Sequence, residues 1–341
     1  MVSFLKALVY GAGGVVVVGM AALVALQERL VYVPVLPGLA RAYPITPARL
    51  RLDYEDVFFR SSDGVRLHAW FVKQSPWKPG NIKAEWAICS NVHLSECKVG
   101  LGEFPSKYRV MLDLEDPPRS ADEIMMQKLH CNVFMLSYRG YGESDGYPSQ
   151  HGIIMDAQAA LDHLIQRTDI DTSRIVVFGR SLGGAVGAML ARNNPDKVSA
   201  IILENTFTSI LDMAAIMFPF LKWFIGSNGP KGPKILNYFV RSPWSTIDII
   251  DKIEQPILFL SGLRDELVPP SHMQMLRSKA IENNRDCRFV DFPNGMHMDT
   301  WYSGGDRYWR AIQLFLDQYV PEIKECNISC KVGEDKGKLL R

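Results

Sequence analysis

Cysteine is scarce in this sequence, and neither sign of charge prevails. Six of the 341 residues are cysteine, and they lack the paired spacing of a zinc site. The sequence therefore predicts no disulfide framework and no metal, and no cofactor is expected. Lys and Arg number 38 against 37 Asp and Glu, which gives a net charge of +1. A nucleic-acid partner is not expected, because such partners select strongly basic surfaces.

Charge is missing altogether from one stretch, the 20 residues from Ala7 to Leu26. A helix of this length spans about 30 Å, the thickness of the hydrocarbon core of a bilayer. A cleaved signal peptide is the competing interpretation, but the run is long for one and no A-x-A site precedes the charged end. We expect residues 1–29 to be a single-pass anchor in the plasma membrane or an endomembrane. Arg29, Arg41, Arg49 and Arg51 follow the run and would favour a cytosolic domain if all are counted, but few positive charges precede it, so the sequence leaves the orientation open.

Short apolar segments alternate with amphipathic ones through residues 53–322. Two strand-like segments come first, joined by Ser61-Ser62-Asp63-Gly64, and its Asp-Gly step is a strong hairpin signal. Further strands are expected at 131–138, 174–179, 198–205, 255–262 and 287–294, and helices at 152–167 and 306–320. This alternation predicts an α/β fold with a mostly parallel sheet covered by helices. A Pro-rich linker at 30–52 precedes it, and a charged tail at 323–341 follows.

Residues 206–247 interrupt the alternation with bulky apolar side chains. Their position between two expected strands predicts a short helical cap over the carboxyl edge of the sheet. Extra core packing is the alternative, but we favour a cap that also lines an apolar substrate pocket. The expected lining residues are Phe207, Phe218, Trp223 and Phe224.

The pentapeptide Gly179-Arg180-Ser181-Leu182-Gly183 matches the G-x-S-x-G pattern of a nucleophile elbow. In that turn a serine stands between a strand and a helix, and small neighbours let the backbone pack closely around it. Here an apolar strand precedes the pattern and a small-residue helix follows it. A phosphate-binding glycine loop is a weaker interpretation, because no lysine follows the glycines. The pattern indicates that Ser181 is a nucleophile and that Leu182 N–H helps to bind an oxyanion.

A nucleophilic serine needs a base, and the base needs an orienting carboxylate. Asp265 follows the strand expected at 255–262, and His297 follows the strand expected at 287–294. Both loops leave the sheet edge from which Ser181 emerges, and the order Ser, Asp, His is that of α/β-hydrolases. We expect His297 to take the serine proton and Asp265 to stabilise the imidazolium.

Other charged residues near this edge suit these roles less well. Glu204 and Glu266 are alternative acids, and Asp299 is expected to cap the loop of His297. Arg139 lies in a glycine-rich turn at the rim of the site, where it is expected to reach a carboxylate that the sequence does not identify.

Six stretches carry a family pattern: SYRGYGESDGYPS, VVFGRSLGGAV, IILENTFTS, RSPW, LFLSGLRDELVPPSHM and FPNGMHMDTW. Together they resemble the bud-emergence-46-like α/β-hydrolases, over about residues 1–73 and 123–320. The resemblance implies an N-terminal transmembrane segment, an α/β-hydrolase domain and a triad of Ser181, Asp265 and His297. It also implies a relation to acyl-protein thioesterases, which act on S-palmitoylated, membrane-bound proteins.

Residues 74–121 depart from that pattern. The family has an apolar strand here and then a loop whose N–H supplies half of the oxyanion hole, whereas this segment has scattered charge and several helix breakers. Its best strand candidate is EWAICSNVHL, at 85–94, and Gly80-Asn81-Ile82 is the expected remnant of the loop. A missing strand would leave buried backbone groups unpaired, at about 1–3 kcal/mol each. Loss of one oxyanion donor typically lowers the rate by ~10²–10³.

The expected function is that of a membrane-anchored serine hydrolase that cleaves acyl esters or thioesters through an acyl-enzyme. The anchor and the aromatic cap favour a lipophilic acyl substrate, such as a lipidated membrane protein. A catalytically impaired scaffold at the membrane is the alternative, and the 74–121 segment favours it. A peptidase would share the same triad.

Overall fold

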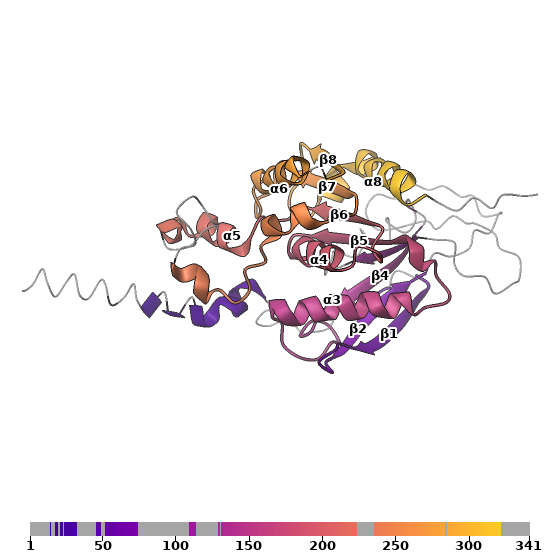
Figure 1. Cartoon of the computed structure of the whole chain (residues 1–341), viewed down its shortest axis with the longest axis horizontal. Coiled ribbons are helices and arrows are strands. Elements are labelled where there is room, and N and C mark those ends of the chain that lie inside the picture. Colours follow the sequence, from indigo (N-terminus) through magenta and orange to yellow (C-terminus); the bar gives the residue numbers. More distant parts are fainter. Residues whose placement is uncertain are drawn as a thin grey trace, which may run out of the picture.

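A computed structural model gives the fold of the chain (Figure 1). It describes residues 52–73, 109–113, 129, 131–223, 235–283 and 285–321, together with 46–48 and parts of 14–32. Predictions for Phe224, for 74–108 and for the tail lie outside these residues. The stretch 24–31 is helical, and no helix among the described residues is both long and apolar enough to cross a bilayer.

Eight strands form one sheet in the order β1-β2-β4-β3-β5-β6-β7-β8. The strands are β1 (Tyr54–Arg60), β2 (Arg66–Val72), β3 (Arg109–Asp113), β4 (Cys131–Ser137), β5 (Ile175–Arg180), β6 (Ala200–Glu204), β7 (Ile257–Gly262) and β8 (Cys287–Phe292). β2 pairs antiparallel with β1 and with β4, and every other neighbouring pair is parallel. The predicted α/β fold with a mostly parallel sheet is confirmed.

The β1–β2 hairpin forms at the predicted Asp-Gly step. Tyr54 pairs with Val72 at one end of the register, and Arg60 pairs with Arg66 beside the turn. Gly64 has φ +85°, a conformation that a side chain would strain, so the glycine specifies the turn.

The centre of the sheet is complete, contrary to the expectation of a missing strand. β3 lies between β4 and β5 and pairs parallel with both, with Met111 opposite Val133 on one side and Val176 on the other. The strand therefore comes from the RVMLD stretch at 109–113 and not from EWAICSNVHL, which lies outside the described residues. RVMLD was overlooked because five residues flanked by charge give a weak periodic signal.

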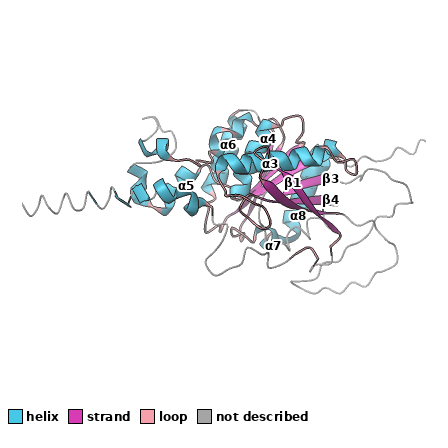
Figure 2. Cartoon of the chain, turned by 90° about the horizontal axis from the view of Figure 1, so that it is seen from below, coloured by secondary structure: helices cyan, strands magenta, loops and turns pink. Residues whose placement is uncertain are grey.

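Helices cover both faces of the sheet (Figure 2). They are α3 (Gln150–Ile165), α4 (Leu182–Asn193), α5 (Ile210–Met217), α6 (Ser271–Glu282), α7 (Thr300–Ser303) and α8 (Gly305–Tyr319). Consecutive strand residues point to opposite faces, so Val177 packs with α3, α4 and α6 while Val176 packs with α8. On the α8 side, Ile312 and Phe315 are fully buried. This two-sided burial explains the continuous apolar strands.

The segment between β6 and β7 is helical. It contains α5 and short 3₁₀ helices at Pro219–Trp223, Ile235–Phe239, Thr246–Asp248 and Ile250–Lys252. Figures 1 and 2 both show α5 at one end of the molecule, beside the N-terminal helical stretch and away from α8. The segment leaves from the carboxyl end of β6, next to the end of β5 that carries Ser181.

Candidate active site

Ser181 lies between the last residue of β5 and the first residue of α4. Its backbone has φ 53° and ψ −120°, a conformation that non-glycine residues rarely adopt. Its N–H donates to Glu204 O at 3.0 Å, and its carbonyl accepts from Gly184 N–H at 3.1 Å and from Thr206 Oγ1 at 2.6 Å. The residue is partly exposed. A strained serine at a strand-to-helix turn has the geometry of a nucleophile elbow.

Two glycines permit the close packing around this turn. A Cβ on Gly179 would lie 2.2 Å from Gly183 O, and a Cβ on Gly184 would lie 2.6 Å from Thr206 Cβ. Neither glycine has a positive φ. The sequence therefore needs glycine here for space, and the strain itself falls on the serine.

The side chains of His297 and Asp265 meet, as the sequence predicts. His297 Nδ1 lies 2.7 Å from Asp265 Oδ2, and both side chains are almost wholly buried. Asp265 Oδ1 accepts from the N–H groups of Leu267 at 2.9 Å and Val268 at 2.7 Å, which fixes the orientation of the carboxylate. A proton on Nδ1 faces the carboxylate in this arrangement, and Nε2 is then the acceptor. A histidine oriented in this way can serve as a base.

Glu204, one of the alternative acids, has other partners. It is wholly buried, accepts a hydrogen bond from the Tyr308 hydroxyl at 2.6 Å and pairs with Arg180 through Nε and Oε1 at 3.2 Å. These contacts engage the Glu204 carboxylate with partners other than His297.

Glu266, beside Asp265 in the loop after β7, and Asp299, in the loop of His297, both accept hydrogen bonds from backbone. Glu266 accepts from His297 N–H at 3.1 Å, not from the ring. Asp299 accepts from Met296 N–H at 2.7 Å and so caps the loop as expected. Asp265 is therefore the carboxylate that orients the imidazole of His297.

Asn205 joins the loops of the site, a role that the sequence reasoning missed. Its side-chain amide donates to the carbonyls of Met296 and His297 at 3.2 and 3.1 Å and to Thr300 Oγ1 at 2.8 Å. Its side-chain oxygen accepts from Gly262 N–H at 2.8 Å, and its own φ is +45°. The available signal was a polar residue directly after a buried strand, at the sheet edge of the expected triad.

One of the two backbone donors expected for the oxyanion lies within the described residues. Leu182 is the first residue of α4, so its N–H has no acceptor within the helix and lies at the positive end of the helix dipole. A second donor in this fold comes from the loop after β3, which starts at residue 114, outside the described residues. The expected remnant Gly80-Asn81-Ile82 precedes β3 and is therefore in the wrong place for that loop.

The expected pocket residues that the structure describes differ in exposure. Phe207 is buried directly after β6, but Phe218 is 38% exposed and Trp223 is 84% exposed. Trp244, in the same segment, is fully buried, so the cap aromatics divide between core and surface. The assignment of Phe207, Phe218 and Trp223 to a substrate pocket stays a prediction.

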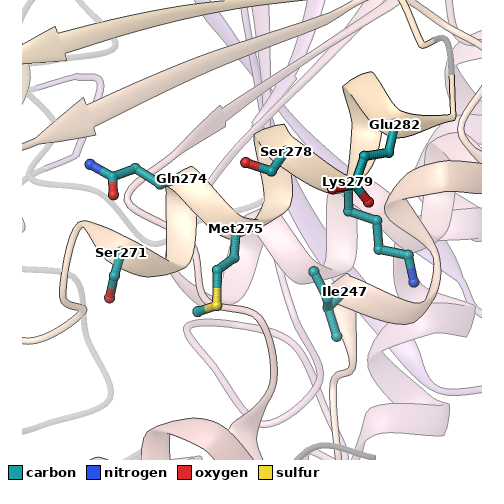
Figure 3. Close-up of a pocket in the computed structure, with 7 residues that line it drawn as sticks. All are labelled: Ile247, Ser271, Gln274, Met275, Ser278, Lys279 and Glu282. Atoms are coloured by element: carbon teal, nitrogen blue, oxygen red, sulfur yellow. The ribbon is translucent and has the colours of Figure 1, made fainter.

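A surface hollow lies along α6 (Figure 3). Its volume is about 520 Å³, and it is lined by Ile247, Ser271, Gln274, Met275, Ser278, Lys279 and Glu282. None of the expected triad residues lines it. The hollow is therefore separate from the Asp265–His297 pair.

The guanidinium of Arg139 forms ion pairs with two carboxylates, Asp156 and Asp63. It donates to Asp156 at 2.8 Å and to Asp63 at 2.7 Å, and Asp156 also accepts from Arg139 N–H at 2.9 Å. The hydrogen bond from Arg139 lowers the pKa of Asp63, whereas burial raises the pKa of Asp156. Arg139 therefore ties the glycine-rich turn to α3 and to the β1–β2 turn.

A second buried histidine lies close to the site. His272, in the first turn of α6, accepts from Thr208 N–H at Nδ1 over 3.2 Å, and burial lowers its pKa. The neutral ring supports the start of the cap segment. Within the described ranges, no three His, Cys, Asp or Glu side chains gather as a metal would require.

Comparison with known proteins places the chain among α/β-hydrolases. Residues 149–321 match the prolyl oligopeptidase family. The chain is 62% identical over 322 residues to the α/β hydrolase domain-containing protein WAV2 of Arabidopsis thaliana, across 94% of this chain and 97% of that protein. It is 34% identical to the protein bem46 of Schizosaccharomyces pombe, across 85% of each. An uncharacterized membrane protein of Saccharomyces cerevisiae is 32% identical, across 88% of this chain and 92% of that protein.

Solved structures agree on the fold. The Pyrococcus furiosus esterase Pf2001 superposes with a TM-score of 0.57 at 18% identity, across 82% of this chain and 95% of that one. A Pyrococcus horikoshii acylaminoacyl peptidase gives 0.56 at 17% identity, across 80% and 43%. The resemblance expected from the sequence motifs is confirmed: the chain belongs to the α/β-hydrolases, in the family of WAV2 and bem46 and within the prolyl oligopeptidase group.

Proposed function

We propose that the protein is a membrane-anchored serine hydrolase that cleaves acyl esters or thioesters. The observation that carries the proposal is the strained Ser181 at one strand end together with the buried Asp265–His297 pair at the same sheet edge. Asn205 and Thr206 support it further, because they bond the elbow, the end of β7 and the histidine loop to one another.

In the proposed reaction, Ser181 Oγ attacks the acyl carbonyl while His297 Nε2 takes the hydroxyl proton. Asp265 stabilises the imidazolium through Nδ1, and Leu182 N–H donates to the oxyanion. Collapse of the tetrahedral intermediate releases the alcohol or thiol, which takes the proton from His297. Water, deprotonated by His297, then attacks the acyl-enzyme and regenerates Ser181 with release of the carboxylic acid.

The membrane location and the substrate class rest on sequence. Ala7–Leu26 has the length and apolarity of a spanning helix, and one relative is named a membrane protein. An anchored hydrolase meets lipophilic acyl groups at the bilayer surface. A lipidated membrane protein is accordingly the favoured natural substrate, and the plasma membrane or an endomembrane the favoured location.

A substrate panel tests the reaction class. The full chain in detergent is given long-chain and short-chain thioesters, the matching oxygen esters and blocked dipeptide amides, with Ser181→Ala as control. We expect acyl release from thioesters or esters, absent in Ser181→Ala. Turnover of the amides alone would contradict the esterase proposal.

A peptidase is the second candidate, because the prolyl oligopeptidase match spans residues 149–321. The same panel separates the two, since an amide leaving group needs protonation by His297 before it departs whereas a thiolate leaves readily. The alternative of a catalytically impaired scaffold was favoured by an expected missing strand. β3 completes the sheet, so that reason no longer applies.

A further inference from the structure

Large apolar side chains gather on the exposed side of the cap segment. Trp223 is 84% exposed and Tyr238 is 75% exposed. The set, called the cap surface here, consists of Met217, Phe218, Phe220, Trp223, Tyr238 and Phe239. Soluble domains rarely expose so many aromatic residues within one segment, and such patches mark a surface that another molecule or a membrane covers.

The N-terminal helical stretch is bonded to the same part of the molecule. Gln27 donates to Phe239 O at 3.1 Å and accepts from Arg241 N–H at 2.7 Å. Nearby, Trp244 Nε1–H donates to the Tyr32 hydroxyl at 2.7 Å in a buried contact. The cap surface is therefore held beside the point where the N-terminal stretch reaches the domain, as Figures 1 and 2 both show.

The sequence around this junction matches a lipid surface. The uncharged run Ala7–Leu26 ends one residue before Gln27, so its end lies at the cap surface. Within 206–247 the basic residues are Lys222, Lys231, Lys234 and Arg241, against the single acid Asp212. Arg241 pairs with Glu28 of the N-terminal stretch at 3.7 Å, so the excess rests on the three lysines. Asp212 is engaged by the hydroxyls of Thr208 and Ser209, at 2.7 Å each. Exposed aromatics with an excess of positive charge are typical of segments that lie in the headgroup region of anionic bilayers.

We propose that the cap surface seats in the headgroup region of an anionic lipid bilayer. The proposal rests on the proposed anchor, which sets the side of the domain on which the bilayer lies. It goes beyond the anchor because it specifies which surface of the domain contacts the lipid. The cap segment leaves the sheet edge that carries Ser181, so seating brings that edge to the lipid surface. Acyl chains then reach the site from the bilayer and not from bulk water.

Tryptophan fluorescence tests the seating directly. The full chain is reconstituted in phosphatidylcholine vesicles, with and without phosphatidylserine, whose acyl chains carry bromine as a quencher. The contribution of Trp223 is the difference between wild type and Trp223→Phe. Trp309→Phe, in α8 at the other end of the molecule from α5, is the matched control. Flotation of the vesicles reports anchoring separately.

We expect the chain to float with the vesicles and the Trp223 difference signal to be quenched, more strongly with phosphatidylserine. The Trp309 difference signal is expected to stay unquenched. Phe220→Asp, an exposed change, is expected to abolish the Trp223 quenching while flotation persists.

Flotation with an unquenched Trp223 overturns the cap proposal and leaves the anchor standing. A dimer in which two chains contact each other through their cap surfaces would also leave Trp223 unquenched. Chemical cross-linking would then give a dimer whether or not lipid is present. Failure to float overturns both the anchor and the seating. A chain that floats and shows Trp223 quenching but hydrolyses no acyl substrate would contradict the enzyme proposal and support the anchor and the seating. The two failures are therefore distinguishable.

Discussion

Gly179 and Gly64 show two different reasons for glycine in this chain. A Cβ on Gly179 meets Gly183 O at 2.2 Å, whereas a Cβ on Gly64 meets nothing within 4 Å but sits at φ +85°. We predict that Gly179→Ala lowers the free energy of unfolding by about 3 kcal/mol, because backbone of the elbow must move. Gly64→Ala is expected to cost about 1 kcal/mol. Urea titration compares the two, and equal losses would contradict the packing argument.

Asn205 offers a test of how the catalytic loops are positioned. Its amide donates to the carbonyl of His297, and its side-chain oxygen accepts from Gly262 N–H. Asn205→Asp keeps the acceptor but places a carboxylate against carbonyl oxygens, so the histidine loop must shift. We predict a loss in kcat of roughly 10–100-fold toward a thioester, with a smaller change in KM.

Asn283→Asp, at the exposed end of α6, is the control for the Asn205 change and is expected to retain full activity. Circular dichroism of Asn205→Asp checks that the domain stays folded at the assay temperature. Unchanged kcat in the folded variant would remove Asn205 from the account of the site.

At the scale of elements, the Arg139–Asp156 pair links α3 to the loop after β4. Asp156 is fully buried and Arg139 is 6% exposed. We predict that Asp156→Ala lowers the free energy of unfolding by about 3 kcal/mol, because it removes the buried partner of Arg139 and leaves the guanidinium with only the partly exposed Asp63 as an ion-pair partner. Asp145→Ala removes the exposed partner of Arg66 and is expected to cost less than about 1 kcal/mol. Chemical denaturation measures both, and similar losses would contradict the role given to burial.

The elements that the sequence predicted well are those with strong local signals. The hairpin turn at Asp63-Gly64, the strand before Ser181 and the long helix α8 each agree with the prediction to within about two residues. β3 was missed because five residues between charged neighbours have no clear periodicity. Its position is set by pairing with β4 and β5, and a long-range contact of that kind leaves little trace in local sequence.

The candidate site was also predictable in part. The Ser181 elbow follows from spacing, and the order of strands brings Asp265 and His297 to the same edge. Asn205 was missed because its role depends on loops more than 50 residues away in the chain. The exposure of Phe218 and Trp223 could not be predicted, because apolarity alone does not reveal which way a side chain faces.

At the scale of the whole molecule, two histidines with lowered pKa values, the partly buried His163 and the buried His272, link stability to pH. Burial lowers the pKa values of His163 and His272, so the unfolded chain binds more protons than the folded one just below pH 6.5. Their contribution to stability is complete above about pH 6.5 and is lost as the pH falls toward the folded pKa values. We predict that the free energy of unfolding decreases from pH 7 toward pH ~5.

His272→Asn keeps an acceptor near Thr208 N–H but cannot titrate, so this variant is expected to show a shallower pH dependence. The exposed His151→Asn is the control and is expected to keep the wild-type slope. Denaturant unfolding across the pH range measures both. Identical slopes for His272→Asn and wild type would contradict the assignment.

Reaction of Ser181 with a fluorophosphonate probe tests the central claim most directly, because the probe labels only activated serines. The full chain is the right material, since Tyr32 and Gln27 contact the domain. Wild type is compared with Ser181→Ala and His297→Ala in detergent. The account predicts labelling of wild type that disappears in both variants; a folded wild type that takes up no label would contradict it.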